Sequence, residues 1–395
     1  MTRRPFGLPA MGLVSPLGMG KGETAANLFA GSRAGLRLRD DLMPARSVYA
    51  GAVGHELPAA PPSYATRNNR MMLAALNQIR EEIDATARRF GRERVAVILG
   101  TSTSGVAEGE AAFASHRATG AWPAGFHYRQ QELGGLARFA VDILDLAGPA
   151  YTIATACSSS AKVFATARRL LAAGLCDAAV VGGADTLCGT TLNGFGTLEA
   201  LSRNLCNPFS RNRDGINIGE AAAAFLMTRD AAPVALLGIG ETSDAHHMSA
   251  PDPKGQGALA AMKAALDDAG LAPGDIAYVN LHGTGTPLND SMEGLAVATL
   301  FGDAVPCSST KAMTGHTLGA AGALEAAFLW LSLHPDYAPG TVPPHVWDGV
   351  RDPAIPSIGL AETGTAVPRA GPLAMMSNSF AFGGSNASLV LGRSA

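Results

Sequence analysis

A cysteine at a predicted strand-to-helix junction is the first residue in the chain with the context of a nucleophile. Cys157 stands in Thr155-Ala156-Cys157-Ser158-Ser159, and the apolar spacing of 163–171 predicts a helix directly after it. A thiol at a helix N-terminus feels the positive end of the helix dipole, so we expect a lowered pKa and a larger thiolate fraction. Backbone N–H groups at such a turn can also bind an oxyanion. From this context alone, an inert buried cysteine is an equally good interpretation.

Two of the nine histidines lie in turns rich in glycine and threonine. His282 opens His282-Gly283-Thr284-Gly285-Thr286-Pro287, and His316 closes Lys311-Ala312-Met313-Thr314-Gly315-His316. Most single histidines are structural or lie on the surface. Each of these two follows a predicted strand in a turn where backbone can approach a ligand, and a neutral imidazole can donate to a developing enolate or oxyanion.

A charged pair and a glycine pair add to this set. Lys311 and Glu325 are predicted to form an ion pair that orients His316, and the apolar neighbours of Glu325 favour a buried pair over a solvated one worth less than about 1 kcal/mol. Gly383 and Gly384 follow Phe382 in a turn whose N–H groups could form an oxyanion hole. A plain β-turn is the alternative interpretation of that segment.

The predicted elements place these residues at one edge of an α/β fold. Strand-like and helix-like segments alternate along the chain, and the candidate residues follow strands, where sites gather in such folds. We expect two α/β domains, 1–230 with the cysteine and 231–395 with both histidines. The proline-rich segment 339–356 is expected to be irregular surface. The strands are expected at 95–99, 151–155, 178–181, 234–239, 276–281, 373–376 and 388–391, with helices at 163–171, 259–266 and 318–333.

The composition excludes several other classes of protein. The 395 residues carry a net charge of −3, which gives no case for binding nucleic acid or an anionic membrane, and no apolar stretch is long enough to span a membrane. We therefore expect a cytoplasmic protein. The five cysteines are odd in number and form no CxxC pair, so neither a disulfide framework nor a zinc site is expected. No dinucleotide or phosphate-binding motif occurs, and we expect no cofactor and no metal.

Taken in order, these motifs make the chain similar to the β-ketoacyl-[acyl-carrier-protein] synthases of the thiolase superfamily, in the elongating class with a Cys-His-His centre. The resemblance covers nearly the whole chain and is strongest from Tyr151 onward. It rests on Thr155–Ser159, Asn207-Pro208-Phe209-Ser210 leading to Arg213-Asp214-Gly215, His282–Asp290, Ser309–Gly322 and Asn378–Gly384.

The resemblance implies a fold, a mechanism and partners. The fold would be two similar α/β halves in five layers, α-β-α-β-α, assembled as a homodimer or as a heterodimer with a chain-length factor. The substrates would be acyl-ACP and malonyl-ACP, joined by decarboxylative condensation.

It also implies a role for each matching residue. Cys157 would carry the acyl chain, His282 and His316 would stabilise the enolate, and Lys311 with Glu325 would hold the His316 loop. Phe382 would act as a gate whose N–H forms the oxyanion hole with that of Cys157. Three further residues would bind substrate, Thr284, Thr286 and Phe380, and three would dock the carrier protein, Arg67, Arg70 and Arg203.

Some positions depart from the family pattern. Ala381 stands where the family commonly has glycine before the gate phenylalanine, and Gly100–Gly105 is more polar than in typical fatty-acid elongators. These features favour a specialised pathway, such as an aryl-polyene-like one that uses a non-catalytic chain-length factor.

Three alternative functions can be weighed against the sequence. The chain could itself be a chain-length factor, but such subunits lack the nucleophilic cysteine. It could be a coenzyme A-dependent thiolase, but Cys307 is the only cysteine in the C-terminal half and is poorly placed to be a second catalytic one. It could be a carrier-binding scaffold, which would tolerate Cys157→Ala without functional loss.

Overall fold

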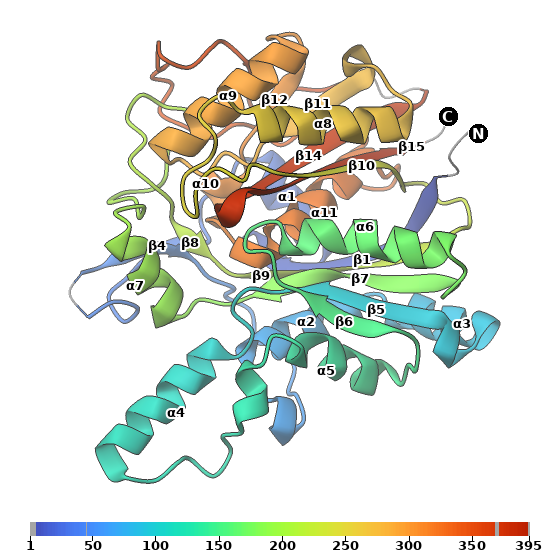
Figure 1. The fold of residues 1–395 in the computed structure, drawn as a ribbon, viewed down its shortest axis with the longest axis vertical. Helices are drawn as coiled ribbons and strands as arrows, with labels where there is room; N and C mark the ends of the chain where they lie inside the picture. Colours follow the sequence, from blue (N-terminus) through green and yellow to red (C-terminus); the bar gives the residue numbers. More distant parts are fainter. Residues whose placement is uncertain (1–4, 45, 368–370, 394–395) are drawn as a thin grey trace.

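The computed structural model describes residues 5–44, 46–367 and 371–393. Their strands form a twelve-stranded sheet in the order β13-β12-β11-β14-β15-β10-β1-β9-β7-β5-β6, with β2 paired to β1, and a small sheet β3-β4-β8. The large sheet consists of two portions that meet where β1 pairs with β10 through Phe6–Leu236 and Gly7–Ala235. Each portion forms a separate layer of the molecule (Figure 1).

The N-terminal portion holds the strands before residue 230. β5 is parallel to β6 and β7, while β9 runs antiparallel to β7 and β1. All residues of β5, β7 and β9 are buried, as continuous apolar strands between two helix layers must be. The bounds are β1 Phe6–Ser15, β5 Val95–Gly100, β6 Ala150–Ile153, β7 Ala178–Asp185 and β9 Ala221–Thr228, with helices α2 Arg67–Asn77, α3 Arg80–Phe90, α5 Gly135–Leu144 and α6 Ser159–Ala172.

The C-terminal portion repeats this plan. β11 is parallel to β12 and β14, and β15 runs antiparallel to β14 and β10. The bounds are β10 Ala235–Ser243, β11 Ile276–Asn280, β12 Pro306–Ser308, β13 Gly359–Leu360, β14 Leu373–Ala381 and β15 Ser385–Arg393, with helices α8 Gln256–Ala269, α9 Pro287–Phe301, α10 Lys311–Thr314 and α11 Ala321–Leu333.

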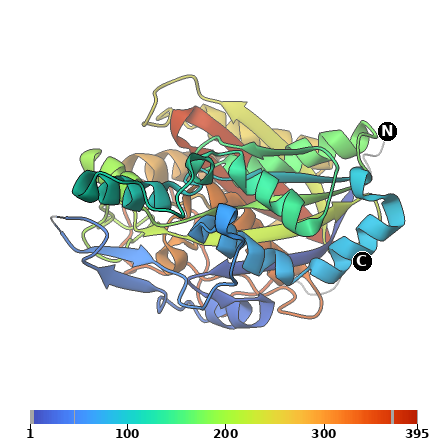
Figure 2. The same ribbon diagram turned by 90° about the horizontal axis from the view of Figure 1, so that it is seen from below.

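Helices α6 and α11 form the middle layer between the two portions. α6 packs on β5 and β7 and also contacts β15, and α11 packs on β14 and β9, so each helix contacts both sheet portions. Helices α8 and α9 cover the outer face of the C-terminal strands, and α2, α3 and α5 cover that of the N-terminal strands (Figures 1 and 2). This five-layer arrangement confirms the predicted fold class.

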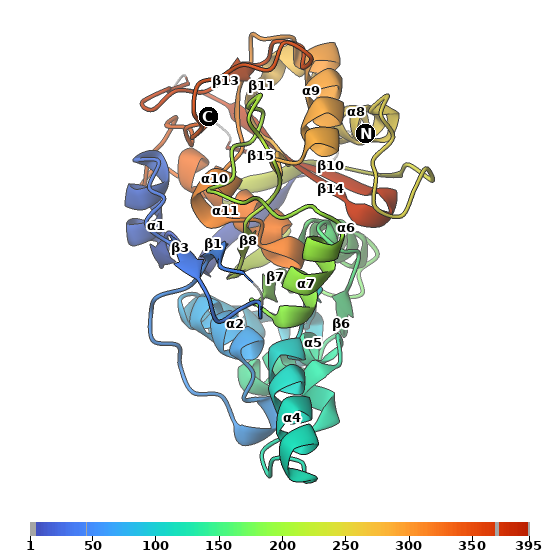
Figure 3. The same cartoon turned by 90° about the vertical axis from the view of Figure 1, so that its left-hand side faces the viewer.

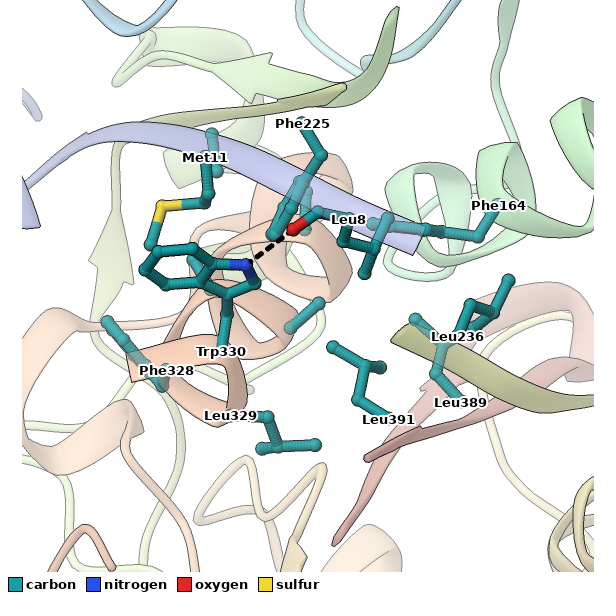
Figure 4. Close-up of a cluster of buried hydrophobic side chains, with 14 of the residues drawn as sticks. Leu8, Met11, Phe164, Phe225, Leu236, Phe328, Leu329, Trp330, Leu389 and Leu391 are labelled. Atoms are coloured by element: carbon teal, nitrogen blue, oxygen red, sulfur yellow. Dashed lines mark hydrogen bonds between the residues drawn. The ribbon is translucent and has the colours of Figure 1, made fainter. Parts of the chain in front are cut away.

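The central core lies between the two sheet portions around α11 (Figure 4). Every residue of α11 is buried, which explains an apolar composition around the whole helix. Trp330 stacks into this core and donates from Nε1 to the carbonyl of Leu8 at 2.9 Å, which joins α11 to β1. Burial of each such large side chain contributes about 2 kcal/mol, so this layer is a main source of stability.

The remaining elements lie around the layers. They are α1 Lys21–Phe29, β2 Gly18–Met19, β3 Leu36–Arg39, β4 Val48–Gly51, α4 Val106–Thr119, α7 Gly189–Thr197 and β8 Ile218–Gly219. Helix α4 and the segment after it extend away from the layered body (Figures 1 and 3). Among the described residues, no helix combines the length and apolar character needed to cross a membrane.

The predicted elements agree with most of these bounds and differ in two instructive places. The predicted helix 318–333 begins with a 3-10 turn at Leu318–Ala320 before α11 starts. The segment 339–356 is irregular, as expected. The expectation that it lies on the surface was wrong for 342–345, which are buried, whereas most of 348–356 is exposed. The division into domains at residue 230 stays a prediction.

Candidate active site

Cys157 lies at the apex of a strained turn between β6 and α6. Ala156 has φ +52°, a left-handed conformation that costs a residue with a Cβ about 1–2 kcal/mol. Ser159 holds the turn, since its hydroxyl donates to the Ala156 carbonyl at 2.6 Å and accepts from the Thr155 N–H at 2.9 Å. The turn places the Cys157 side chain, 6% exposed, in front of the first turn of α6.

His282 follows β11 and is fixed through its backbone. A buried carboxylate on α9, Glu293, accepts from the N–H of His282 and from that of Gly283, each at 2.7 Å. Gly283 has φ +40°, and a Cβ there would lie 2.4 Å from Cβ of Ser309. The close approach of these two segments therefore requires glycine after His282.

His316 follows α10 and contacts the nucleophile. Its Nε2 lies 3.0 Å from Sγ of Cys157, and its ring meets that of His282 at a centroid distance of 5.2 Å and an angle of 84°. Its backbone N–H donates to the Asn217 carbonyl at 2.7 Å, and its carbonyl accepts from Gly219 N–H at 2.9 Å. The two histidines and the cysteine thus come together from three loops of both sheet portions.

Both histidines are neutral over the physiological pH range. Burial lowers the pKa of His282 and of His316 well below the usual value, and the Lys311 cation lowers both further. Neutral imidazoles can donate hydrogen bonds to an oxyanion without acting as strong acids. This charge state matches the expectation from the sequence.

Lys311 contacts His282 rather than His316. Its Nζ lies 2.5 Å from Oε1 of Glu325 and 3.5 Å from Nδ1 of His282, and both members of the ion pair are buried. The predicted ion pair is present. The ammonium of Lys311 approaches His282, and not His316 as expected. The reason is that α10 directs the Lys311 side chain toward β11, while His316 is held through its backbone by 217–219.

The pKa of Cys157 moves in the opposite direction to the one expected. Burial raises it to about 11, and this exceeds the lowering by Lys311 and by the N–H groups of Phe382 and of Cys157 itself. The pKa of Cys157 was expected to be low because the helix terminus favours the thiolate. Burial removes water from around the sulfur and disfavours the thiolate more strongly. The resting site therefore holds a thiol in contact with a neutral imidazole.

A cavity of about 270 Å³ leads to these three side chains. The predicted substrate-binding residues Thr284, Thr286 and Phe380 line it, and the hydroxyls of the two threonines lie 2.9 Å apart. The cavity wall also includes Phe195, Leu198, Asp214, Asp244, Leu288 and Phe382.

The residue predicted to be a gate, Phe382, lines this cavity together with Cys157. Phe382 is half-buried, and the centroid of its ring lies 5.5 Å from that of Phe195. Its backbone N–H donates toward Sγ of Cys157, which lowers the pKa of that thiol. Gly383 and Gly384 have φ +81° and +72°, which favour glycine. Ala381 has extended backbone at φ −95°, so its Cβ causes no strain in this conformation.

The same three side chains have the composition of a metal site. The ligand atoms of Cys157, His282 and His316 lie within 4.8 Å of one another, and no other such group occurs among residues 5–44, 46–367 and 371–393. A metal-bound histidine normally donates its second N–H to an acceptor. Nδ1 of His282 instead faces a cation, and Nδ1 of His316 has no partner, so the surroundings do not fit a metal.

The three predicted docking arginines lie in different settings, and none of them lines the cavity. Arg67 makes a two-pronged ion pair with the buried Glu220, at 2.5 and 2.8 Å. Arg70 donates to the carbonyls of Leu57 and Pro58, while Arg203 is exposed. Their role in docking stays a prediction, and Arg67 and Arg70 also have structural partners.

Sequence reasoning missed two buried carboxylates that shape the site. Glu293 holds the His282 loop, as described above. Asp185, at the end of β7, accepts from six donors in Thr101, Ser102, Thr103 and Gly319, and so joins the loop after β5 to the segment after His316. The sequence could have indicated that Glu293 and Asp185 are buried, because each is an acidic residue among apolar residues or glycines.

Comparisons with known proteins agree with this geometry. The chain matches the beta-ketoacyl synthase N-terminal domain over residues 9–232 and the beta-ketoacyl synthase C-terminal domain over residues 234–345. The 3-oxoacyl-[acyl-carrier-protein] synthase 2 of Coxiella burnetii is 38% identical over 269 residues, which is 63% of this chain and 63% of that protein. Its namesake from Staphylococcus aureus is 36% identical over 62% of this chain and 61% of its own length. The matched region thus spans less than two thirds of these curated relatives.

Solved structures match over the full length. A chain of the complex between the ketosynthase ApeO and its chain length factor ApeC from Xenorhabdus doucetiae is 47% identical, with a TM-score of 0.93 over 99% of this chain and 98% of that one. A beta-ketoacyl synthase from Burkholderia phymatum is 30% identical, with a TM-score of 0.83 over 100% of both chains. With the family matches covering most of its residues, the chain belongs to the β-ketoacyl synthase family.

Proposed function

We propose that the chain is a β-ketoacyl-ACP synthase that extends an acyl chain by decarboxylative condensation with malonyl-ACP. The observation that carries the proposal is the placement of one buried thiol against two neutral histidines at the end of a cavity. A thiol alone would fit many enzymes. Two neutral N–H donors beside it suit a reaction that must stabilise an enolate without protonating it.

The first half-reaction transfers the acyl group to the enzyme. The Cys157 sulfur attacks the thioester carbonyl of acyl-ACP while the thiol proton passes to Nε2 of His316, 3.0 Å away. The N–H groups of Cys157 and Phe382 stabilise the oxyanion. Collapse breaks the bond to the carrier sulfur, which takes the proton from His316 and leaves as a thiol.

The second half-reaction forms the carbon–carbon bond. Malonyl-ACP loses carbon dioxide, and the electrons of the broken bond form an enolate. Its oxygen accepts from Nε2–H of His282 and, once His316 has moved its own proton to Nε2, from that ring as well. The enolate carbon attacks the acyl-Cys157 carbonyl, and the thiolate leaves and takes up from water the proton that decarboxylation consumes. Lys311 supports this step, because an ammonium at Nδ1 of His282 leaves the N–H of that ring on Nε2.

We infer that the partners are an acyl carrier protein and a second synthase-like subunit. The 47% identity to a chain of a ketosynthase–chain length factor complex supports a heterodimer of that kind and a specialised pathway such as an aryl-polyene-like one. A homodimer is the alternative assembly. We also place the reaction in the cytoplasm, since all five cysteines are free thiols, as a reducing compartment would keep them.

Intact-mass measurement tests the proposed function. Wild-type protein is incubated with a panel of acyl-ACPs, and malonyl-ACP is then added. We expect an acyl mass on the wild type that is absent from Cys157→Ala and is discharged as a product two carbons longer. Failure of every acyl-ACP to label the wild type, alone and with a chain-length-factor partner, would refute the proposal.

A further inference from the structure

A third buried histidine lies behind the site, outside the cavity. His345, 6% exposed, stands in the irregular segment between α11 and β13. Its Nδ1 accepts from the N–H of Ser309 at 3.1 Å, and its Nε2 donates to the carbonyl of Pro208 at 3.0 Å. A backbone N–H can only donate and a carbonyl can only accept, so both partners fix a single tautomer. Burial lowers the pKa of His345 to about 4, and the ring is a neutral bridge of fixed length.

One end of this bridge holds the segment that carries Lys311. The Ser309 hydroxyl donates to the carbonyl of Gly283 at 2.6 Å and accepts from the N–H of Lys311 at 3.3 Å. Ser309 thus lies between the residue that follows His282 and the residue whose ammonium contacts His282. A shift of Ser309 would change the 3.5 Å separation between Lys311 and His282.

The other end of the bridge holds a second support of the same loop. Phe209, next to Pro208, has φ +60° and packs its ring against His345 at 5.9 Å. The N–H of Phe209 donates to Asp290 at 2.8 Å, and the other oxygen of Asp290 accepts from Gly285 at 3.2 Å. His345 therefore joins two segments that support the loop of His282, one directly through Ser309 and the other through Asp290.

The nucleophile has a separate support, and the support of His316 meets the Pro208 segment at one bond, from the N–H of Cys206 to the side-chain oxygen of Asn217. Cys157 is held by the Ser159 turn, and His316 by the backbone of 217–219. No hydrogen bond joins His345 to either support among the described residues. A change at His345 should consequently reach His282 before it reaches the nucleophile.

We propose that His345 is a positioning residue for the decarboxylation half of the reaction, which sets the Lys311–His282 contact by accepting from the N–H of Ser309, while its bond to Pro208 fixes the tautomer that can accept. The proposal rests on the proposed function, because it assigns His345 to one of its two half-reactions. A residue with only a packing role would affect both half-reactions and the stability of the fold together.

Two amide substitutions separate the two bonds of His345. In His345→Asn the side-chain oxygen stays near the position of Nδ1 and can accept from Ser309. In His345→Gln the amide nitrogen can reach Pro208, while the Ser309 N–H loses its acceptor. His334→Asn is the matched control, since His334 is a partly buried histidine that stacks on Trp330 away from the site.

The experiment measures each half-reaction as a single-turnover rate. Acyl transfer to Cys157 is followed by intact mass, and carbon dioxide release is followed after malonyl-ACP is mixed with enzyme already acylated. Such rate constants do not depend on the fraction of folded protein. We expect His345→Gln to slow carbon dioxide release by about tenfold, the equivalent of one lost hydrogen bond, with acyl transfer within about twofold of wild type. His345→Asn should keep most of the wild-type rate of carbon dioxide release, because it still accepts from Ser309. His334→Asn should change neither rate.

Three results would overturn the inference. They are equal loss of both rates in His345→Gln, loss of acyl transfer alone, and wild-type rates in both steps. Equal defects in His345→Asn and His345→Gln would also contradict the role given to Ser309. A wild type that is acylated but releases no carbon dioxide would refute the proposed function itself, which distinguishes that failure from failure of the inference.

Discussion

The ammonium of Lys311 lies 3.5 Å from Nδ1 of His282, deep in the protein and away from water. An ammonium has hydrogens to donate and no lone pair, so the ring nitrogen facing it must accept. This leaves the proton of His282 on Nε2, available to an oxyanion. Under the proposed function, the buried Lys311–Glu325 pair would therefore have a chemical role beyond stability.

Replacing the ammonium should impair condensation more than acyl transfer. In Lys311→Met, Nδ1 of His282 loses its donor, and the ring can take the tautomer that has no N–H toward the substrate. We expect carbon dioxide release from the acylated enzyme to fall by about a hundredfold, the usual loss for one oxyanion donor. Stopped-flow measurement of carbon dioxide gives the rate.

Glu325→Gln is the control for that variant. It removes the charge of Glu325 and keeps the lysine, so condensation should fall less than in Lys311→Met. A larger loss in Glu325→Gln would show that the lysine acts mainly through its ion pair and not through His282.

The reactivity of Cys157 should continue to rise at high pH. Only the thiolate is alkylated, and burial raises the pKa of this thiol to about 11. The alkylation rate should therefore increase about tenfold per pH unit between roughly pH 7 and 10, whereas an ordinary thiol would level off near its own pKa. Iodoacetamide labelling, read at the Cys157 peptide by mass spectrometry, measures the rate. A plateau below pH 9 would contradict the raised pKa, and Lys311→Met should slow labelling at every pH, because it removes a cation that lowers the pKa.

The two glycines of the gate should tolerate alanine to different degrees. Both have positive φ, so each substitution costs about 1–2 kcal/mol of backbone strain. A Cβ on Gly383 would have no atom within 4 Å, whereas one on Gly384 would lie 2.9 Å from Cβ of Asp244. Denaturant unfolding should show that Gly384→Ala is the less stable variant. Equal losses would mean that the loop at Asp244 moves aside without cost.

Loss of Arg67 should lower the stability of the fold, whereas loss of Arg203 should affect only docking of the carrier. Arg67→Ala leaves the carboxylate of Glu220, 1% exposed, without its ion-pair partner and with backbone donors only, and should lower the free energy of unfolding by about 3 kcal/mol. Arg203→Ala removes an exposed charge and should change stability by less than about 0.5 kcal/mol. If Arg203 docks the carrier, its loss should raise KM for acyl-ACP more than for a small thioester. An equal change in both KM values would exclude docking.

The fold and the reactive residues could be predicted because local patterns determine them. Buried strands such as Val95–Gly100 appear as continuous apolar runs, and loops after strands collect functional residues in α/β folds. The positions of Cys157, His282 and His316 relative to strands followed from these patterns. Their convergence in space followed only from the family resemblance.

The supports of these residues could not be predicted because they depend on tertiary contacts. The partner of Lys311 depends on where α10 points, and the pKa of Cys157 depends on how completely the site is enclosed. His345 lies in a proline-rich segment that looks like surface, and its burial follows from the contact of its backbone with Ala361. Side-chain roles of this kind have no periodic signature in the sequence.

The position of β1 between the two sheet portions bears on how the chain folds as it is synthesised. Val14 in β1 pairs with Ala222 in β9, and Phe6 pairs with Leu236 in β10, so the first strand made must wait for partners far along the chain. Until those strands leave the ribosome, this apolar strand has only the short β2 to pair with, at Val14 and Ser15. Such long-range pairing slows folding and exposes an unpaired strand to aggregation. Chaperone binding to nascent chains should accordingly be strongest before residue 243 emerges, and the yield of folded protein should depend on the rate of translation up to that point.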